Sequence, residues 1–142
     1  MTATTGFSLD PRLESDTSPI ASLALCELLL MEDARFPWLV LVPRRPGLAD
    51  LIDLSAEGRP QATREIDAAA RALKTATGCD KLNVAALGNM VRQLHIHVIA
   101  RFESDAAWPG PVWGVGARTV YEASRRDTLV AAVKQALGAG PV

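Results

Sequence analysis

Polar and apolar side chains alternate from residue 93 to residue 98, and this alternation constrains the fold more than any other feature of the chain. The polar positions are Gln93, His95 and His97, and the apolar ones are Leu94, Ile96 and Val98. Residues i and i+2 of an extended strand project from the same face. We therefore predict a central antiparallel strand over residues 94–102, with the polar side chains in one row on an open face of the sheet and the apolar ones in the core.

The segments around this strand predict further strands. Residues 21–31 are rich in leucine and fit either a helix or a buried strand by periodicity alone. We favour a strand, because residues 32–37 read as a turn and residues 38–42 form a short β-prone run, which together make an antiparallel hairpin. Residues 82–87 predict a third strand, linked to the central one by a turn at Gly88.

A long helix is predicted between the hairpin and the third strand. It begins at Ser55, a good N-cap residue, and ends at Gly78, which readily adopts the left-handed conformation. Its apolar face carries Ile66, Ala69, Ala70 and Leu73, and its solvent face carries Arg64, Glu65, Arg71 and Lys74.

The two ends of the chain complete the pattern. A last helix is predicted from residue 124 to residue 137, with its end at Gly138. Residues 1–20, interrupted by Pro11 and Pro19, are predicted to form an irregular arm. The order of strands, helix, strands and helix indicates an α+β domain built on an antiparallel sheet.

Size and charge exclude several classes of protein. The chain has 142 residues, the usual size of one domain, so we predict a single domain over residues 1–142. Its net charge of -1 provides no basic field, which argues against a general nucleic-acid partner. The apolar runs of the sequence, residues 28–31 among them, are far too short to span a bilayer, so no membrane partner is expected. Cys26 and Cys79 form no CxxC pair, and free thiols without a secretory signal predict a cytoplasmic protein.

His95 and His97 are the two histidines of the sequence, and they carry its most distinctive chemistry. Neutral imidazole is a good nucleophile that protonates near physiological pH, so the pair can attack phosphorus or carry a proton. Two alternatives stay open: histidines on a strand face often have no function, and a His-x-His pair can ligate zinc. A catalytic zinc site usually has three protein ligands, however, and Glu103 and Asp105 have the wrong parity or lie too far along the strand. No metal site is therefore predicted.

Residues 88–101, with the sequence GNMVRQLHIHVIAR, resemble the signature of the histidine-triad superfamily. The shared features are a glycine turn, a strand of alternating histidine and hydrophobic residues, and a trailing Val-Ile-x-Arg. The resemblance covers roughly residues 20–114 in the order and type of elements. It implies an antiparallel sheet of about five strands with one long helix and a C-terminal helix. Arg101, at the end of the motif, is expected to face solvent.

In that family the middle histidine attacks the α-phosphorus of a nucleotide, and water then hydrolyses the nucleotidyl-histidine. The resemblance implies that His95 is the nucleophile, that His97 is a phosphate donor, and that Gln93 stands in place of the first histidine. An amide cannot act as an acid or base, but it can donate to a phosphoryl oxygen or hold a backbone carbonyl. Trp38 occupies the position of a histidine on the preceding hairpin, so two site positions have changed together.

The resemblance also implies residues that bind the nucleotide. Either Glu32 or Asp33 would hold the ribose hydroxyls, Asn83 would face the same site, and Asn89 would meet the phosphate. Simpler interpretations are a solvated turn pair for the two acids and a turn former for Asn89. Met90 stands where relatives often carry Ser or Thr, so one hydroxyl contact to phosphate is expected to be missing.

The function implied by the resemblance is hydrolysis or nucleotidyl transfer at the α-phosphate of a nucleotide conjugate or dinucleoside polyphosphate. The partner would be a purine nucleotide or its conjugate, and the chain would form a homodimer. No cofactor is required, although a divalent metal ion can accompany a polyphosphate substrate. The alternative is a catalytically weak nucleotide-binding or regulatory module with the same fold. The changes at Gln93 and Trp38 favour this module, whereas retention of His95 and His97 favours the enzyme.

Overall fold

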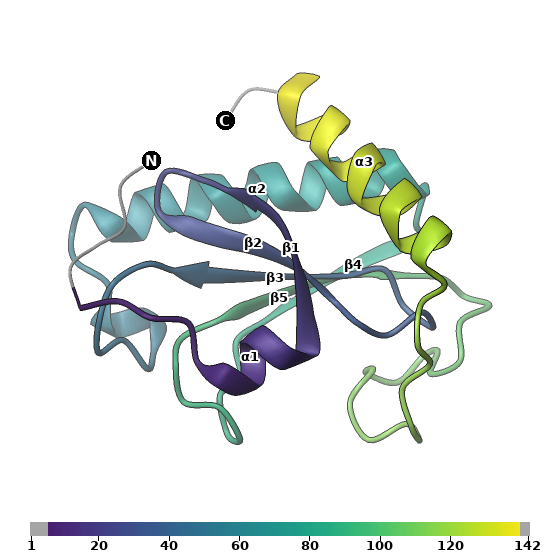
Figure 1. The fold of residues 1–142 in the computed structure, drawn as a ribbon, viewed down its shortest axis with the longest axis horizontal. Coiled ribbons are helices and arrows are strands. Elements are labelled where there is room, and N and C mark those ends of the chain that lie inside the picture. The colour runs from purple at the N-terminus through teal and green to yellow at the C-terminus, as the bar shows by residue number, and fades with distance from the viewer. Residues whose placement is uncertain (1–5, 140–142) are drawn as a thin grey trace.

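The computed structural model describes residues 6–139, which form a five-stranded antiparallel sheet with helices packed against it (Figure 1). The strands are β1 (Thr17–Ser22), β2 (Cys26–Met31), β3 (Trp38–Pro43), β4 (Lys81–Ala85) and β5 (Ile96–Arg101). They lie in the order β1-β2-β3-β5-β4, and each neighbouring pair is antiparallel. The predicted α+β fold class is confirmed.

The helices are α1 (Pro11–Asp16), the short 3-10 helix η1 (Leu51–Asp53), α2 (Gly58–Thr77) and α3 (Ala123–Ala139). As predicted, α2 ends at Gly78, whose φ of +67° is left-handed and whose N–H donates to the carbonyl of Lys74. The predicted stop of α3 at Gly138 is wrong, because α3 continues to Ala139; a lone glycine costs a helix only about 1 kcal/mol. None of the helices described between residues 6 and 139 is long and apolar enough to cross a membrane.

The two faces of the sheet bury separate hydrophobic clusters. Leu94, Ile96 and Val98 belong to the cluster beneath α2 and α3, as the alternation predicts. The opposite face carries a second cluster, in which Val40 and Ile99 of the sheet pack against Leu13 of α1 and Val112 of the segment after β5. The prediction that this histidine-bearing face is open is therefore wrong: a helix and a loop segment cover it, which sequence alternation alone cannot reveal.

The predicted irregular arm over residues 1–20 is also wrong within the described residues, because α1 and most of β1 lie there. Pro11 directly follows the N-cap residue Asp10 in the first turn of α1, where the missing N–H costs no helical hydrogen bond. Pro19 lies in β1, which forms an edge of the sheet, where proline is tolerated beside a register irregularity. Both prolines occupy permitted positions within regular structure.

The prediction that Glu65 lies on the solvent face of α2 is wrong, because its side chain is fully buried. Its two carboxylate oxygens accept the backbone N–H groups of Leu25 and Cys26, each at 2.8 Å, where the turn after β1 leads into β2. The Gln61 amide donates to it as well, at 2.6 Å. A buried carboxylate is stable only with such partners, so Glu65 fastens α2 to the hairpin. Cys26 and Cys79 are free thiols, as predicted, and both are buried.

Candidate active site

His95 and His97 come together where the polypeptide enters β5. His97 lies on β5, opposite Val40 of β3 and Ala85 of β4. The imidazole centroids of the two histidines are 4.9 Å apart, with ring planes inclined at 74°. The strand is shorter than predicted: β5 begins at Ile96, so Gln93 and His95 lie on the segment before it, and of the three predicted polar positions His97 alone is on the strand. Both histidines are buried, with 7% and 4% of their surfaces exposed.

The protonation of His95 follows from its hydrogen bond. Its Nδ1 lies 2.6 Å from the backbone carbonyl oxygen of Gln93. A carbonyl oxygen can only accept, so Nδ1 must carry the proton and donate it. In the neutral ring Nε2 then keeps its lone pair. The backbone of the motif thereby prepares Nε2 of His95 as the nucleophilic atom.

His97 is held in the opposite tautomer by Trp38. The indole Nε1–H of Trp38 donates to Nδ1 of His97 at 3.0 Å. Indole has no acceptor, so Nδ1 of His97 is unprotonated and the proton of the neutral ring lies on Nε2. Burial, with a smaller contribution from the nearby His95, lowers the pKa of His97 to about 4. His97 is therefore a neutral Nε2–H donor at physiological pH.

Aromatic rings surround His97. Its centroid is 5.6 Å from that of Trp38 and 5.1 Å from that of Trp113, which comes from the segment after β5. Trp38 and Trp113 also meet edge to face at 5.7 Å. These contacts fix the ring of His97 and keep water from it, which explains both its neutrality and its orientation.

A hollow of about 150 Å³ opens beside His95. Its lining residues besides His95 are Ala49, Asp50, Leu51, Ala86, Leu87, Gly88 and Leu94. Leu51 and Leu87 are 47% and 44% exposed, so the hollow has apolar groups in contact with solvent. Among the cavities of the described residues, this one borders the candidate nucleophile, and it is where a substrate can approach His95.

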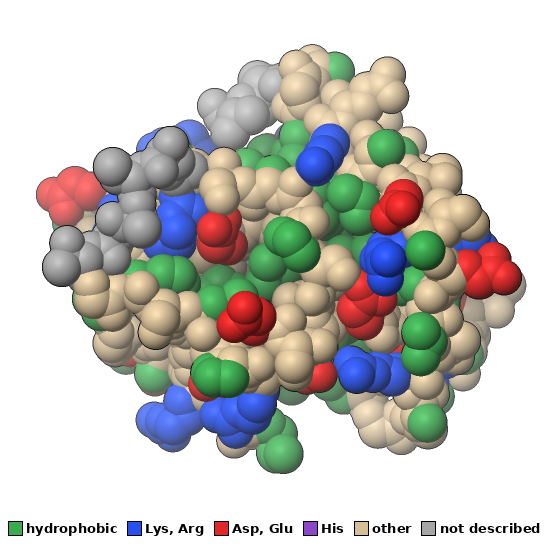
Figure 2. Space-filling view, viewed as in Figure 1, with side chains coloured by type: hydrophobic (Ala, Val, Ile, Leu, Met, Phe, Trp, Pro, Cys, Tyr) green, Lys and Arg blue, Asp and Glu red, His purple; other side chains and the backbone are tan. Residues whose placement is uncertain are grey.

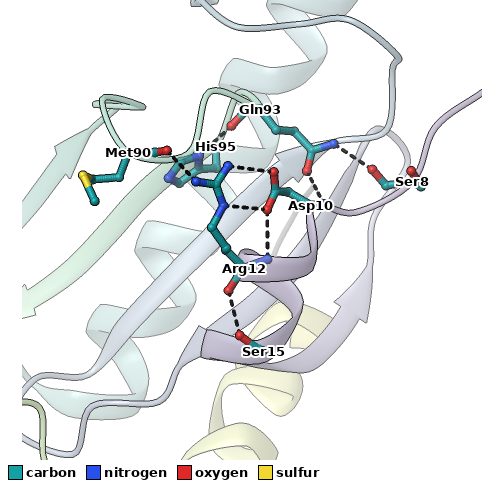
Figure 3. A network of polar contacts seen from close by, with 7 residues as sticks. All are labelled: Ser8, Asp10, Arg12, Ser15, Met90, Gln93 and His95. Atoms are coloured by element: carbon teal, nitrogen blue, oxygen red, sulfur yellow. Dashed lines mark hydrogen bonds and ion pairs between the residues drawn. The ribbon is translucent and has the colours of Figure 1, made fainter.

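The amide of Gln93 is directed at the N-terminal segment of the chain (Figure 3). Its Nε2 donates to the carbonyl of Ser8 and its Oε1 accepts the N–H of Asp10, both at 2.8 Å. Of the two uses predicted for this amide, the structure shows it holding a backbone carbonyl. Sequence reasoning missed Asp10 and Arg12, because both lie in the segment that was predicted to be irregular.

The two candidate ribose ligands have partners within the protein. Asp33 is buried, pairs with Arg35 at 2.8 Å, and accepts the N–H of Thr119 at 3.2 Å. Glu32 accepts a short hydrogen bond from Ser18 and pairs with Arg126 at 3.4 Å. These contacts connect the end of β2 to β1 and to the C-terminal part of the chain.

The candidate Asn83 lies on the same face of the sheet as His97, two positions along β4 from Ala85. Its side-chain oxygen accepts a hydrogen bond at 2.8 Å from Arg101, which is 2% exposed rather than facing solvent as expected. Arg101 also binds Asp105 through Nε at 2.8 Å. Burial would raise the pKa of Asp105, but hydrogen bonds from Arg101 and from backbone N–H groups outweigh it and hold that pKa well below its usual range.

Asn89 occupies an exposed position in the turn between β4 and β5. It follows Gly88, whose φ of +75° is left-handed and requires glycine at the start of this turn. Within residues 6–139, no group of three or more His, Cys, Asp or Glu side chains is arranged to hold a metal ion.

Comparison with known proteins assigns the chain to a class. The sequence model described as the HIT domain matches residues 12–104, more than half of the chain. The protein therefore belongs to the histidine triad, or HIT, family. No curated protein sequence matches the chain significantly.

Solved structures of histidine triad proteins agree with this assignment over nearly the whole chain. One from Bradyrhizobium japonicum is 47% identical with a TM-score of 0.92, and the match covers 93% of this chain and 98% of that one. One from Sinorhizobium meliloti is 46% identical with a TM-score of 0.90, covering 92% and 97%. One from Marinobacter aquaeolei is 40% identical with a TM-score of 0.90, covering 94% and 97%.

Proposed function

We propose that this protein is a nucleotide hydrolase or nucleotidyl transferase that attacks the α-phosphorus of its substrate with Nε2 of His95. The observation that carries the proposal is the pair of opposite tautomers in two adjacent rings. The Gln93 carbonyl leaves His95 with a free Nε2 lone pair, and Trp38 leaves His97 with an Nε2–H. A nucleophile beside a neutral donor is the arrangement that attack on an anionic phosphoryl group needs.

The reaction has two steps. His95 Nε2 forms a bond to the α-phosphorus, and the bond to the leaving group breaks, with the electron pair departing on that group. Water then attacks the nucleotidyl-histidine, the P–N bond breaks, its electron pair returns to Nε2, and one proton passes to solvent. His97 donates its Nε2–H to a phosphoryl oxygen as negative charge gathers there. The chemistry requires no cofactor, although a divalent ion can accompany a polyphosphate substrate.

The nucleotide is proposed to place its phosphate at His95 and the turn residue Asn89. The proposal that Glu32 or Asp33 holds the ribose requires the carboxylate to exchange an internal partner for the hydroxyls, and Asn83 would likewise have to release Arg101. Replacing both acids with alanine should weaken binding of a nucleoside more than binding of inorganic phosphate. Equal effects on the two ligands, measured by calorimetric titration, would remove these acids from the site.

The second candidate is a nucleotide-binding or regulatory module with little turnover. It is favoured by one observation: both ends of the Gln93 amide are engaged by the backbone of Ser8 and Asp10. The first triad position therefore supplies neither an acid nor a base. In this case the protein would bind purine nucleotides without consuming them. Homodimerisation remains a prediction for either function.

The deciding experiment measures hydrolysis of an adenosine phosphoramidate and of a dinucleoside polyphosphate. His95→Ala should abolish turnover, and His97→Ala should lower it by roughly 10²–10³, as for one lost transition-state donor. His95→Asn should still bind nucleotide. Phosphoramidate turnover should survive EDTA; chelator-sensitive turnover restored by zinc would instead establish a metal mechanism. Turnover unchanged in His95→Ala would end the nucleophile proposal, and nucleotide binding without turnover would establish the module.

A further inference from the structure

The N-terminal segment lies against the loop that enters β5, and Gln93 holds it there. The amide of Gln93 bonds the backbone at Ser8 and Asp10, more than eighty residues away in sequence. The backbone carbonyl of Gln93 meanwhile accepts the Nδ1–H of His95 at 2.6 Å. One residue therefore fixes both the nucleophile and the segment beside it (Figure 3).

Arg12 is the charged group that this arrangement brings to the site loop. Its Nη1 donates to the carbonyl of Met90 at 2.9 Å, three residues before Gln93. Its Nε and Nη2 each donate to a different oxygen of Asp10 at 3.3 Å. Figure 3 shows the guanidinium between the Met90 carbonyl and the Asp10 carboxylate. Of its five N–H groups, these bonds use three and leave two for a ligand.

The Arg12–Asp10 ion pair presents its positive end to solvent beside the loop that leads to His95. The Arg12 side chain is 61% exposed, whereas that of its partner Asp10 is 21% exposed, so the positive end of the pair is the more accessible one. Hydrogen bonds from Arg12 keep the pKa of Asp10 below its usual value, so the carboxylate stays charged and paired. Figure 2 shows Lys or Arg side chains gathered at the lower edge of the molecule, near α1 and the loop before β5.

We propose that Gln93 is a positioning residue that holds residues 8–12 against the site, and that Arg12 held in this way binds a second phosphate of the substrate. This inference rests on the proposed attack by His95. If Arg12 binds a second phosphate, the protein should prefer phosphoanhydrides, in which the leaving group is itself a phosphate, to phosphoramidates, which release an amine.

The preference follows from where charge develops. When a phosphoanhydride P–O bond breaks, its electron pair departs on the second phosphate, and a guanidinium stabilises the charge that grows there. When a phosphoramidate P–N bond breaks, the amine takes a proton from solvent and leaves without negative charge. Arg12 therefore assists the first reaction and contributes little to the second.

The test compares binding of AMP and ADP by calorimetric titration, using ADP as the ligand with a second phosphate. Arg12→Ala should weaken ADP by about 10-fold, as for one partly exposed charged hydrogen-bond donor, and leave AMP nearly unchanged. The matched control is Arg71→Ala on α2, which removes an exposed arginine paired with Asp67 away from the site and should alter neither ligand. Equal weakening of both ligands by Arg12→Ala, or no weakening, would overturn the inference and leave the proposed function standing. Failure of the unaltered protein to bind either nucleotide would overturn both.

The positioning role of Gln93 has its own readout. Gln93→Ala should weaken the binding of ADP relative to AMP as much as Arg12→Ala does. The double variant should bind ADP no more weakly than either single variant, because the two residues act in one chain of contacts. Gln93→Glu should behave like the alanine variant, since a carboxylate cannot donate to the Ser8 carbonyl. Thermal unfolding of each variant shows that the fold is retained. A Gln93→Ala protein that is folded and keeps its preference for ADP would refute the positioning role.

Discussion

Replacing Trp38 with phenylalanine tests whether the indole N–H sets the state of His97. The substitution keeps an aromatic ring but deletes the donor that lies 3.0 Å from Nδ1 of His97. Both side chains are buried, at 6% and 4% exposure, so water cannot readily replace the lost donor. An unsatisfied buried acceptor costs about 1–3 kcal/mol, and we expect the free energy of unfolding to fall by about that amount.

The sharper readout is the protonation of the ring itself. Long-range ¹H–¹⁵N NMR at neutral pH should show an unprotonated Nδ1 and a protonated Nε2 for His97 in the unaltered protein. In Trp38→Phe the proton should exchange between both nitrogens, and turnover should fall because a fraction of the rings present no Nε2–H donor. Trp113→Phe is the control: it alters a ring 5.1 Å from His97 whose N–H bonds to none of the described residues. An unchanged tautomer in Trp38→Phe, or the same change in the control, would refute the reasoning.

Two further predictions concern stability. His97 has a pKa of about 4 when folded and an ordinary value near 6.5 when unfolded, so its contribution is complete above about pH 6.5 and is lost as the pH falls to about 4. Urea unfolding should show a loss of roughly 3 kcal/mol across that range, and His97→Asn should flatten the slope; an equal slope in the variant would contradict the assignment. Asp105→Asn should destabilise the protein by about 3–5 kcal/mol by leaving Arg101 buried without its charge partner, whereas Asp67→Asn, in an exposed pair, should cost less than about 1 kcal/mol. An equal decrease in the free energy of unfolding in the two variants would show that the buried Arg101–Asp105 pair contributes no more to stability than an exposed pair.

The sequence pattern correctly predicted the elements that are determined by residues close together in the chain. The alternation around Ile96 placed β5 and its buried face, and the glycine at position 78 placed the end of α2. The pattern failed where a distant partner decides. Glu65 looks like a solvent-facing charge on a helix, yet N–H groups some forty residues away hold it in the core. Pro11 and Pro19 look like breaks, yet each occupies a position at which no N–H is needed.

The candidate site divides in the same way. His95 and His97 are two residues apart on β5 and the segment that leads into it, so the sequence alone predicts that they lie close together. The bond from Trp38 depends on β3 pairing with β5, and the bonds from Gln93 depend on a segment that closes over the sheet from the other end of the chain. Neither contact leaves a local sequence signal. The identities of the two substituted positions could be read from the sequence, whereas the partners they acquired could not.

Intact-protein mass spectrometry tests the central claim most directly. The protein is mixed with an adenylated substrate, quenched at alkaline pH to preserve a phosphorus–nitrogen bond, and examined for the added mass of one adenylyl group. We predict that the unaltered protein carries this group, that His97→Ala carries it after slower formation, and that His95→Ala never does. Turnover by the unaltered protein without any adduct, or an adduct that persists in His95→Ala, would contradict the assignment of His95 as the nucleophile.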